Sequence, residues 1–271
     1  MLSVNIGPLA MASSHLILSI SLLLATLTGW WMGRHRERNP EKHLFNLLLL
    51  GLIVGRLAFV LMYFEHFRPN LWQIIDIRDG GFIIWPGIGA ALLAGLWLAW
   101  RDLTLRIPLG TALAVGLIFW GTSSYMLHAL QQGTQLPEMT LLDVEGEQVA
   151  LQDLNGRPLV INLWATWCPP CRREMPVLAA AQQQHSDIVF AFINQGEGPG
   201  EITRYLQESE LTLNNVLLDT GGQFGQQVGS HALPTTLFYN AQGQQVASHM
   251  GELSAASLSH QLVKLEEDDT P

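Results

Sequence analysis

Cysteine is scarce in this 271-residue sequence: Cys168 and Cys171 are the only two, and two prolines separate them. A closed zinc site takes four ligands, and the sequence offers neither a second cysteine pair nor two histidines at His-x3-His spacing. We therefore expect no metal and no other cofactor, and we interpret the cysteines as a redox pair. Half of a zinc site and a pair of inert structural thiols are the alternatives.

Charged residues are also few, at 14% of the sequence, and the two signs are unevenly distributed. Residues 1–133 contain nine Lys and Arg against six Asp and Glu, whereas residues 134–271 contain five against seventeen. Proteins that bind nucleic acid present basic surfaces, so the acidic second half argues against nucleic acid as a partner. The change in composition also divides the chain into two predicted domains.

Long apolar segments are present, and all of them lie in the first half. They cover residues 16–32, 44–64, 82–100 and 107–127. Each is long enough to cross a hydrocarbon core of about 30 Å. We therefore predict a polytopic membrane domain with four spans over residues 1–130, in contact with membrane lipids. Four buried helices of a soluble protein are the alternative.

The loops between these segments predict the orientation of the chain. Basic residues gather after the first and third segments: Arg34, Arg36, Arg38, Lys42, Arg101 and Arg106. Loops rich in Lys and Arg face the cytoplasm, so the N-terminus and the chain beyond residue 127 lie on the other side. We expect a linker at residues 131–135 and a periplasmic domain at residues 136–271 of a bacterial inner-membrane protein. Cysteine pairs in that oxidising compartment usually form disulfides.

The two cysteines lie where a predicted strand is followed by a predicted helix. The β-prone run of residues 158–164 ends just before the motif Trp-Cys-Pro-Pro-Cys, and residues 172–185 have helical character. Residues three positions apart share a helix face, which brings the two sulfur atoms within reach of a disulfide. Proline is tolerated here because N–H groups in the first turn of a helix have no helical partner.

A helix N-terminus favours an anion, because its N–H groups are unpaired and its dipole is positive there. We therefore expect Cys168 to lose its proton more readily than a free thiol does. Cys168 is the predicted nucleophile in thiol-disulfide exchange, and Cys171 is the thiol that resolves the mixed disulfide.

The second half alternates short β-runs with amphipathic helices. Besides the central strand at 158–164, we predict strands at residues 139–143, 147–150, 188–194, 216–219, 235–240 and 244–250. Further helices are predicted at residues 200–208, 223–228 and 254–265, the last one capped by Ser254. This alternation predicts an α/β fold with a central mixed sheet flanked by helices.

Four motifs occur together in this half. They are Trp-Ala-Thr-Trp-Cys-Pro-Pro-Cys at 164–171, Glu-Met-Pro at 174–176, Asn-Gln-Gly-Glu at 194–197 and Leu-Pro-Thr-Thr at 233–236. In combination they make nearly all of residues 134–271 resemble the TlpA/ResA-like branch of the thioredoxin superfamily. The resemblance implies a thioredoxin-like fold and a membrane-tethered oxidoreductase with a redox-active Cys168–Cys171 disulfide.

The resemblance also implies roles for residues around the cysteines. Pro234 would be a cis-proline that faces them and exposes the backbone of Leu233 to an extended substrate strand. An ordinary trans proline in a turn is the alternative. We expect Trp167 and Pro169, on either side of Cys168, to bind the substrate together with Leu233.

Glu174 is the candidate for proton transfer, because family members commonly carry an acidic residue at this position. As a general base it must lie within hydrogen-bond reach of Cys171, directly or through a water molecule. A carboxylate that is merely favoured by the helix dipole is the alternative. Thioredoxins proper carry a buried Asp where this chain has Asn162, which cannot take a proton. Any such duty therefore falls on Glu174.

Three further side chains near the motifs have two interpretations each. Arg172 and Arg173 either help to hold the thiolate or form a solvated helix face. His231, three residues before Pro234, either lies close to the site or serves packing at the surface.

A second resemblance lies in the membrane half. The segments Gly55–Tyr63 and Asp79–Gly81 resemble part of the N-terminal half of prolipoprotein diacylglyceryl transferases. In that family a histidine important for activity follows, and Trp85 occupies its position here. The resemblance therefore implies a borrowed membrane scaffold. Arg56 either contacts lipid or is an arginine that is tied to a neighbouring helix or that snorkels to the interface.

These observations predict a membrane-anchored periplasmic thiol-disulfide oxidoreductase that reduces disulfides in partner proteins. The predicted spans contain no cysteine to relay electrons, so we expect an external electron donor such as a DsbD-like membrane reductant. The alternatives are a lipoprotein diacylglyceryl transferase-like membrane protein with an appended redox domain, and a non-catalytic membrane adaptor.

Overall fold

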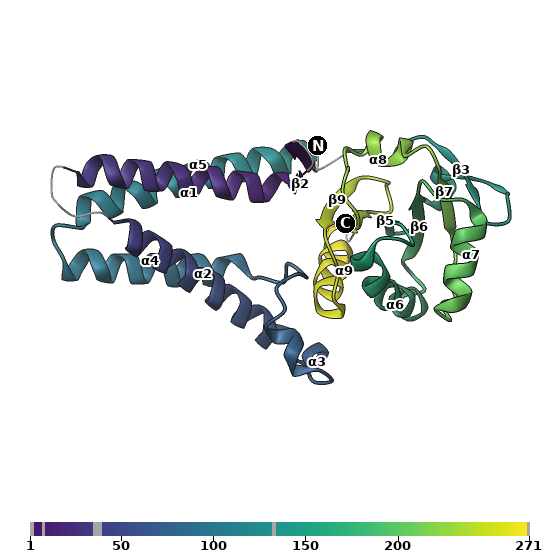
Figure 1. Cartoon of the computed structure of the whole chain (residues 1–271), viewed down its shortest axis with the longest axis horizontal. Coiled ribbons are helices and arrows are strands. Elements are labelled where there is room, and N and C mark those ends of the chain that lie inside the picture. The colour runs from purple at the N-terminus through teal and green to yellow at the C-terminus, as the bar shows by residue number, and fades with distance from the viewer. Residues whose placement is uncertain (1–2, 7–8, 35–39, 132–133, 270–271) are drawn as a thin grey trace. The chain divides into compact units, whose positions relative to one another are not determined.

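The computed structural model describes residues 3–6, 9–34, 40–131 and 134–269. The chain forms two compact units, which we describe separately (Figure 1). One comprises residues 14–77 and 81–127, and the other comprises residues 1–13, 78–80 and 128–271. Arg36 and Arg38 of the first basic loop, and positions 132 and 133 of the expected linker, lie outside the described residues.

The apolar first half is helical. Its helices are α1 (Ser13–Gly33), α2 (Glu41–Met62), α3 (Phe64–Phe67), the 3-10 helix η1 (Leu71–Ile74), α4 (Ile84–Arg101) and α5 (Arg106–Gln131). Among the described residues, α1, α2 and α5 are long and apolar enough to cross a membrane. The prediction of four spans is therefore supported for three of them. Helix α4, the third predicted span, has 18 residues and includes Pro86 and Arg101.

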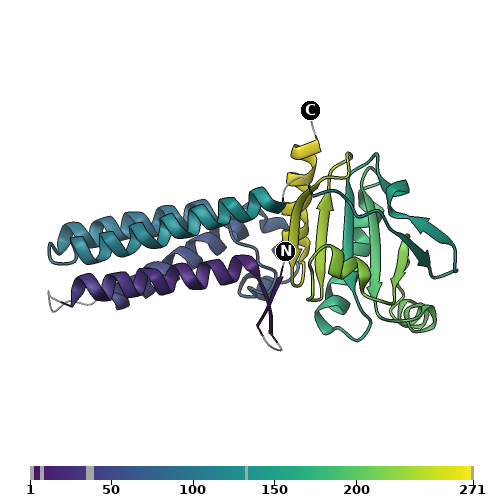
Figure 2. The same cartoon turned by 90° about the horizontal axis from the view of Figure 1, so that it is seen from above.

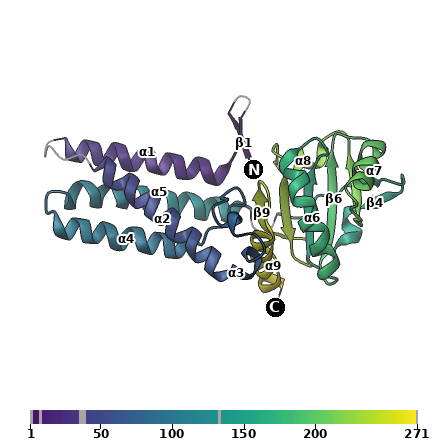
Figure 3. The ribbon, with the colours of Figure 1, turned by 60° about the horizontal axis from the view of Figure 1, so that its bottom comes forward.

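Helices α2 and α4 pack against each other through glycines (Figures 1 and 3). A Cβ atom added to Gly87 would lie 2.5 Å from the carbonyl oxygen of Gly51. A Cβ atom on Gly55 would lie 3.0 Å from the carbonyl oxygen of Ile83, whose N–H group donates a hydrogen bond to Gly55 O at 3.1 Å. Small residues that allow such close backbone approach are typical of packing between membrane helices.

The second unit is built on a seven-stranded mixed sheet, whose strands lie side by side in Figure 2. In spatial order they are β4 (Gln148–Ala150), β3 (Thr140–Asp143), β7 (Val216–Asp219), β6 (Val189–Gln195), β5 (Leu159–Trp164), β8 (Thr235–Tyr239) and β9 (Gln245–Met250). Strands β5, β6 and β7 are parallel, and the other neighbouring pairs are antiparallel.

Both faces of the sheet are covered. The covering elements are α6 (Pro169–Gln184), α7 (Pro199–Glu208), α8 (Gln223–Gln227), α9 (Ala255–Asp269) and the 3-10 helix η2 (Leu151–Leu154). Successive side chains of a strand point to opposite faces, so β5 contributes to two cores. Val160 and Trp164 pack in the core that contains residues of α6, α7 and α9, and Leu159, Ile161 and Leu163 pack in the core that contains residues of η2 and α8.

The central position of β5 determines where the cysteines lie. Every residue of β5 is buried, which explains why five of its six residues are apolar; the exception is Asn162. Its last residues are paired with the end of β6 (Trp164 with Asn194) and with the start of β8 (Leu163 with Thr235). The loop after Trp164 therefore emerges beside the ends of two other strands, where sites in open α/β sheets usually form.

The predicted α/β fold with a mixed central sheet is confirmed. The predicted strand at 216–219 coincides with β7, and the hairpin predicted at 235–250 is β8–β9. Ser254 caps α9, because its Oγ accepts the N–H of Ser257 at 3.1 Å. The helix after the motif begins at Pro169 and not at residue 172, since prolines suit the first helical positions. The antiparallel pair β1 (Ser3–Ile6) and β2 (Leu9–Ala12) was not predicted.

Replacing Gly87 with Ala should destabilise the helical unit, because the added methyl group meets the Gly51 carbonyl group. We expect a loss of about 1–3 kcal/mol, measured as a lower thermal unfolding midpoint of the full chain in detergent. Gly89→Ala is the matched control, because a Cβ atom at Gly89 meets nothing within 4 Å and Ala favours the helix. Equal stability of the two variants would contradict the packing described for α2 and α4.

Candidate active site at the start of helix α6

The two cysteines are joined in the structure. Cys168 and Cys171 form a disulfide, with their Cα atoms 5.3 Å apart. Cys168 is the N-cap residue of α6, and its Sγ accepts a hydrogen bond from the N–H of Cys171 at 3.3 Å. The prolines at 169 and 170 fill the first helical positions, where an N–H group would have no partner. The backbone therefore directs an N–H group and the positive end of the helix toward the first sulfur atom.

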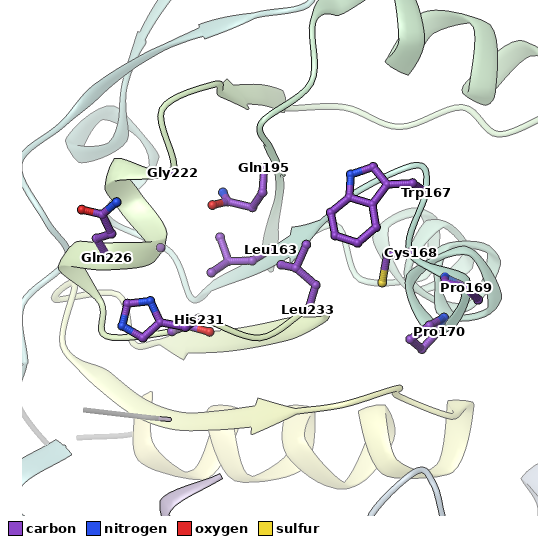
Figure 4. A pocket seen from close by; sticks show the side chains of 12 residues that line it. Leu163, Trp167, Cys168, Pro169, Pro170, Gln195, Gly222, Gln226, His231 and Leu233 are labelled. Atoms are coloured by element: carbon purple, nitrogen blue, oxygen red, sulfur yellow. The ribbon is translucent and has the colours of Figure 1, made fainter. Parts of the chain in front are cut away.

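The two sulfur atoms are not equally accessible. Cys171 is completely buried, whereas Cys168 is 3% exposed and lines a cavity of about 460 Å³. In Figure 4 the side chains of Trp167, Cys168 and Leu233 line one end of this cavity, and Gln226 and His231 lie at the other. An incoming sulfur atom meets Cys168 first, which is the arrangement that an attacking thiol and a resolving thiol require.

The residues expected to bind the substrate surround the cavity. Trp167, Pro169 and Leu233 all line it, and the Trp167 side chain is 67% exposed. His231 is exposed and also lines the cavity, at the end opposite Cys168. Their participation in binding remains a prediction, although an exposed tryptophan beside a cavity is suited to contact with another protein.

Pro234 lies at the start of β8. The Leu233–Pro234 peptide bond is cis, which is the geometry implied by the resemblance. The carbonyl group of Pro234 accepts a hydrogen bond from the N–H of Gly251 at 3.0 Å. This bond connects the cis-proline, which follows the cavity-lining Leu233, to the segment between β9 and α9, residues 251–254.

Glu174 is a completely buried carboxyl group on α6. One oxygen accepts a hydrogen bond from Nδ2 of Asn162 at 2.8 Å, and the other accepts the N–H of Leu253 at 2.9 Å. Burial is the largest influence and raises the pKa of Glu174 to about 8, while both hydrogen bonds lower this pKa and the charge of Glu252 raises it. Glu174 can therefore gain or lose a proton near neutral pH.

Asn162 can hydrogen-bond to Glu174 in both protonation states of the Glu174 carboxyl group. It lies on β5, is 1% exposed, and donates through Nδ2 to both Glu174 and Oγ1 of Thr236. Its Oδ1 is buried without a hydrogen-bond partner. An amide donates through nitrogen to a carboxylate and accepts through oxygen from a protonated carboxyl group. Asn162 can thus serve either form of Glu174, and it adds no charge of its own.

The two arginines after the motif contact other residues than the cysteines. The guanidinium carbon of Arg172 lies 5.4 Å from the ring centroid of Tyr205, which is a cation–π contact. Arg173 forms an ion pair with Glu252. These contacts support the interpretation that the two arginines form a helix surface. They do not support a direct role of either arginine in holding the thiolate.

Glu197 holds the loop that precedes the cysteines, a role that the sequence motif did not reveal. Its Oε2 accepts the N–H of Thr166 at 2.6 Å and Nδ2 of Asn194 at 2.8 Å, and its Oε1 accepts the Thr166 hydroxyl group. Thr166 lies two residues before Cys168. The carboxylate therefore connects the end of β6 to the turn that carries Cys168.

Arg56 is tied into the helical unit. It is 6% exposed, and its guanidinium group donates to the carbonyl oxygens of Gln73, Ile74, Asp76 and Gly81 at 2.5–3.1 Å. Three phenylalanine rings, those of Phe59, Phe67 and Phe82, lie within 6 Å of the guanidinium carbon. The guanidinium group thus fastens the loop between α2 and α4. Trp85, at the position of the transferase histidine, is 80% exposed.

Each half of the chain matches a known family. The model of the Redoxin family matches residues 131–260, and the model of the prolipoprotein diacylglyceryl transferase family matches residues 2–123. The thioredoxin-like protein YneN of Bacillus subtilis is 28% identical over 137 residues, which are 49% of this chain and 79% of YneN. The thiol-disulfide oxidoreductase ResA of Bacillus subtilis is 29% identical over 140 residues, which are 51% of this chain and 76% of ResA.

Solved structures also resemble this half of the chain. StoA from Bacillus subtilis has a TM-score of 0.41 and 20% identity, covering 46% of this chain and 95% of StoA. A secreted disulfide oxidoreductase from Mycobacterium tuberculosis has a TM-score of 0.43 and 23% identity, covering 47% of this chain and 96% of its own.

Replacing Glu197 with Ala should slow thiol-disulfide exchange about 10-fold or more, because the loop that carries Cys168 loses its anchor and the reacting sulfur is less well placed. Reduction of a small disulfide by the full chain, followed by stopped-flow absorbance, measures the rate. Glu208→Ala on the exposed face of α7 is the control and should leave the rate unchanged. If the Glu197 and Glu208 variants react at the same rate, the anchoring role is wrong.

Proposed function

We propose that this chain reduces disulfides of partner proteins at the outer face of a bacterial cytoplasmic membrane. Its thiol-disulfide oxidoreductase domain is homologous to ResA, and this domain follows a membrane region similar to prolipoprotein diacylglyceryl transferases. One observation carries the proposal: Cys168 lines an open cavity at the start of α6, and Cys171 is enclosed behind it. A partner protein can reach only the first sulfur atom directly.

The reaction begins with both cysteines reduced. The Cys168 thiolate attacks one sulfur atom of the substrate disulfide, and the other substrate sulfur leaves as a thiolate that takes a proton from water. Cys171 then gives its proton to a base and attacks Sγ of Cys168, which releases the second substrate sulfur as a thiolate that takes a proton from water. Two electrons pass from the cysteine pair to the substrate, and the Cys168–Cys171 disulfide is formed.

Glu174 is the base that we assign to the second step. It lies one turn beyond Cys171 on the same helix, where residues three apart are neighbours, and both side chains are completely buried. With its pKa near 8, the ionised carboxylate can take the Cys171 proton while the substrate is released. The protonated form can return a proton to Cys171 when an electron donor opens the disulfide again.

The substrate is expected to bind as an extended segment. Trp167 and Pro169, the sequence neighbours of Cys168, supply apolar contacts. The backbone of Leu233, next to the cis-proline, supplies the hydrogen-bonding groups that a strand requires. Disulfide-containing proteins that are partly unfolded offer such segments. Folded proteins whose disulfides are buried do not.

We further propose that α4 is a fourth membrane span. At about 1.5 Å per residue, its 18 residues extend nearly as far as a hydrocarbon core of about 30 Å, and its glycine contacts with α2 support a place inside the membrane. The number of spans matters because an even number returns the chain to the side of its N-terminus. Together with cytoplasmic basic loops, four spans place the redox domain in the periplasm.

The electrons must come from another protein. Both cysteines of the sequence belong to the redox domain, so the helices of this chain offer no thiol that could carry electrons across the membrane. A DsbD-like membrane reductant, which presents a dithiol on the outer side, has the required chemistry. Its thiolate would attack the Cys168–Cys171 disulfide and regenerate the dithiol in two exchange steps.

A transferase activity of the membrane region is not part of the proposal. The donors of Arg56 are directed at backbone carbonyl groups of this chain, and Trp85 has no group that can accept a proton.

Replacing Cys171 with Ser should trap substrates as mixed disulfides in intact cells, because Cys168 still attacks but nothing releases the product. Non-reducing gels of acid-quenched cells, followed by mass spectrometry, identify the trapped proteins. The control Cys168→Ser should trap none. Trapping by both variants to the same extent, or by neither when both are folded, would contradict the proposed reaction.

Replacing Glu174 with Gln should slow the release of the mixed disulfide about 10²-fold. In the unmodified chain the carboxylate is the active form, so this rate should rise with pH around a midpoint near 8; in the variant the rise should be absent. Stopped-flow kinetics of the full chain measure both effects. An unchanged midpoint in the variant would contradict the role of Glu174.

Stability gives an independent check on the protonation of Glu174. The raised pKa means that the folded state holds this proton more tightly than the unfolded state, so its contribution to stability is complete below about pH 4.5 and is lost as the pH rises through about 8. The Glu174→Gln variant should lack this loss in urea unfolding experiments.

A further inference from the structure

An ion pair joins helix α6 to the segment between β9 and α9. Arg173 donates from Nε to Oε2 of Glu252 at 2.8 Å and from Nη2 to the same oxygen at 2.6 Å. The arginine side chain is 44% exposed and the glutamate side chain 19% exposed, so the pair is partly shielded from water. Both residues are direct sequence neighbours of groups in the Glu174 hydrogen-bond network.

Short connections link the ion pair to both Glu174 and Pro234. Glu252 immediately precedes Leu253, whose N–H donates to the Glu174 carboxyl group at 2.9 Å. On the other side of Glu252, the N–H of Gly251 donates to the carbonyl group of Pro234 at 3.0 Å. Residues 251–253 therefore connect the cis-proline to the buried carboxyl group of Glu174. Arg173 contacts this segment through Glu252.

Among the groups around Glu174, Glu252 is the one whose charge shifts the pKa of the Glu174 carboxyl group. Helix α6 contributes Cys171, which can titrate once the disulfide is reduced. Strand β5 contributes the neutral amide of Asn162, which also contacts Thr236 on β8. The segment after β9 contributes the N–H of Leu253 and the carboxylate of Glu252.

We propose that Arg173 and Glu252 are positioning residues that together control proton exchange at Glu174 during thiol-disulfide exchange. The proposal rests on the function proposed above, and it adds a pair of residues that do not touch the reacting sulfur atoms. Glu252 opposes the carboxylate form of Glu174 by its negative charge. Arg173 counters this charge and keeps the Leu253 N–H in place.

The two residues should therefore act in opposite directions. Without the arginine, the Glu252 charge is uncompensated and the Leu253 hydrogen bond is less firmly held, and both changes disfavour the Glu174 carboxylate. Without the glutamate charge, the carboxylate is favoured. A purely structural ion pair behaves differently, because removal of either partner breaks the same contact and has the same consequence.

The test measures the pH midpoint of mixed-disulfide release by the full chain in four variants: Arg173→Gln, Arg173→Lys, Glu252→Gln and the exposed control Arg204→Gln. We expect Arg173→Gln to raise the midpoint by about half a pH unit and Glu252→Gln to lower it by about as much. Arg173→Lys should lie close to the unmodified chain, and so should Arg204→Gln. Because the pair is partly exposed, both shifts should shrink at about 1 M salt.

A second readout does not depend on catalysis. The carboxyl stretching band of Glu174, assigned by its loss in Glu174→Gln, can be titrated by infrared difference spectroscopy in the same variants. Shifts of opposite sign in the two neutralising variants support the proposal; shifts of the same sign, or none, overturn it. If Glu174→Gln leaves the kinetic midpoint unchanged, the proposed base is wrong, and the infrared titration still decides whether the pair controls the carboxyl group.

Discussion

The start of helix α6 is the constraint on which the redox domain depends. The N–H of Cys171 is directed at Sγ of Cys168, and the two intervening prolines fit the first turn without losing a helical hydrogen bond. This geometry requires β5 to end at Trp164 inside the sheet, so that the chain emerges beside β6 and β8. Two cysteines of one short motif become chemically unequal in this way, because one lines a cavity and the other is enclosed.

A buried polar network lies next to this helix start. Such a network costs stability, which indicates that it serves function. A carboxyl group such as Glu174 is costly to ionise inside a protein, and a well-packed apolar residue would avoid that cost. Its partners come from β5 and from the segment after β9, which also contacts the carbonyl group of Pro234. The buried carboxyl group of Glu174 and the cis-proline beside the cavity are thus parts of one connected structure. Perturbed carboxyl groups in such positions are characteristic of active sites.

The sequence predicted the elements of the redox domain well, because its strands are short apolar runs between clear turn residues and its one cysteine pair marks a strand–helix junction. Contacts between segments that are distant in the sequence could not be predicted. Leu253 lies 79 residues from Glu174, and Glu197 lies 31 residues from Thr166, so only the folded chain shows these hydrogen bonds. Arg56 was equally ambiguous until its carbonyl partners were known. Apolar length alone predicted residues 82–100 as a membrane span, whereas the structure supports spans for α1, α2 and α5.

The account is tested most directly by the rate at which a membrane-impermeant thiol reagent labels reduced Cys168 in intact cells, measured as a function of external pH. We predict labelling without permeabilisation, with a midpoint clearly below that of an ordinary thiol, roughly 8.5. Labelling that needs permeabilised cells would place the redox domain in the cytoplasm. A midpoint at the ordinary value would show that the start of α6 does not activate this sulfur, and either result would contradict the account.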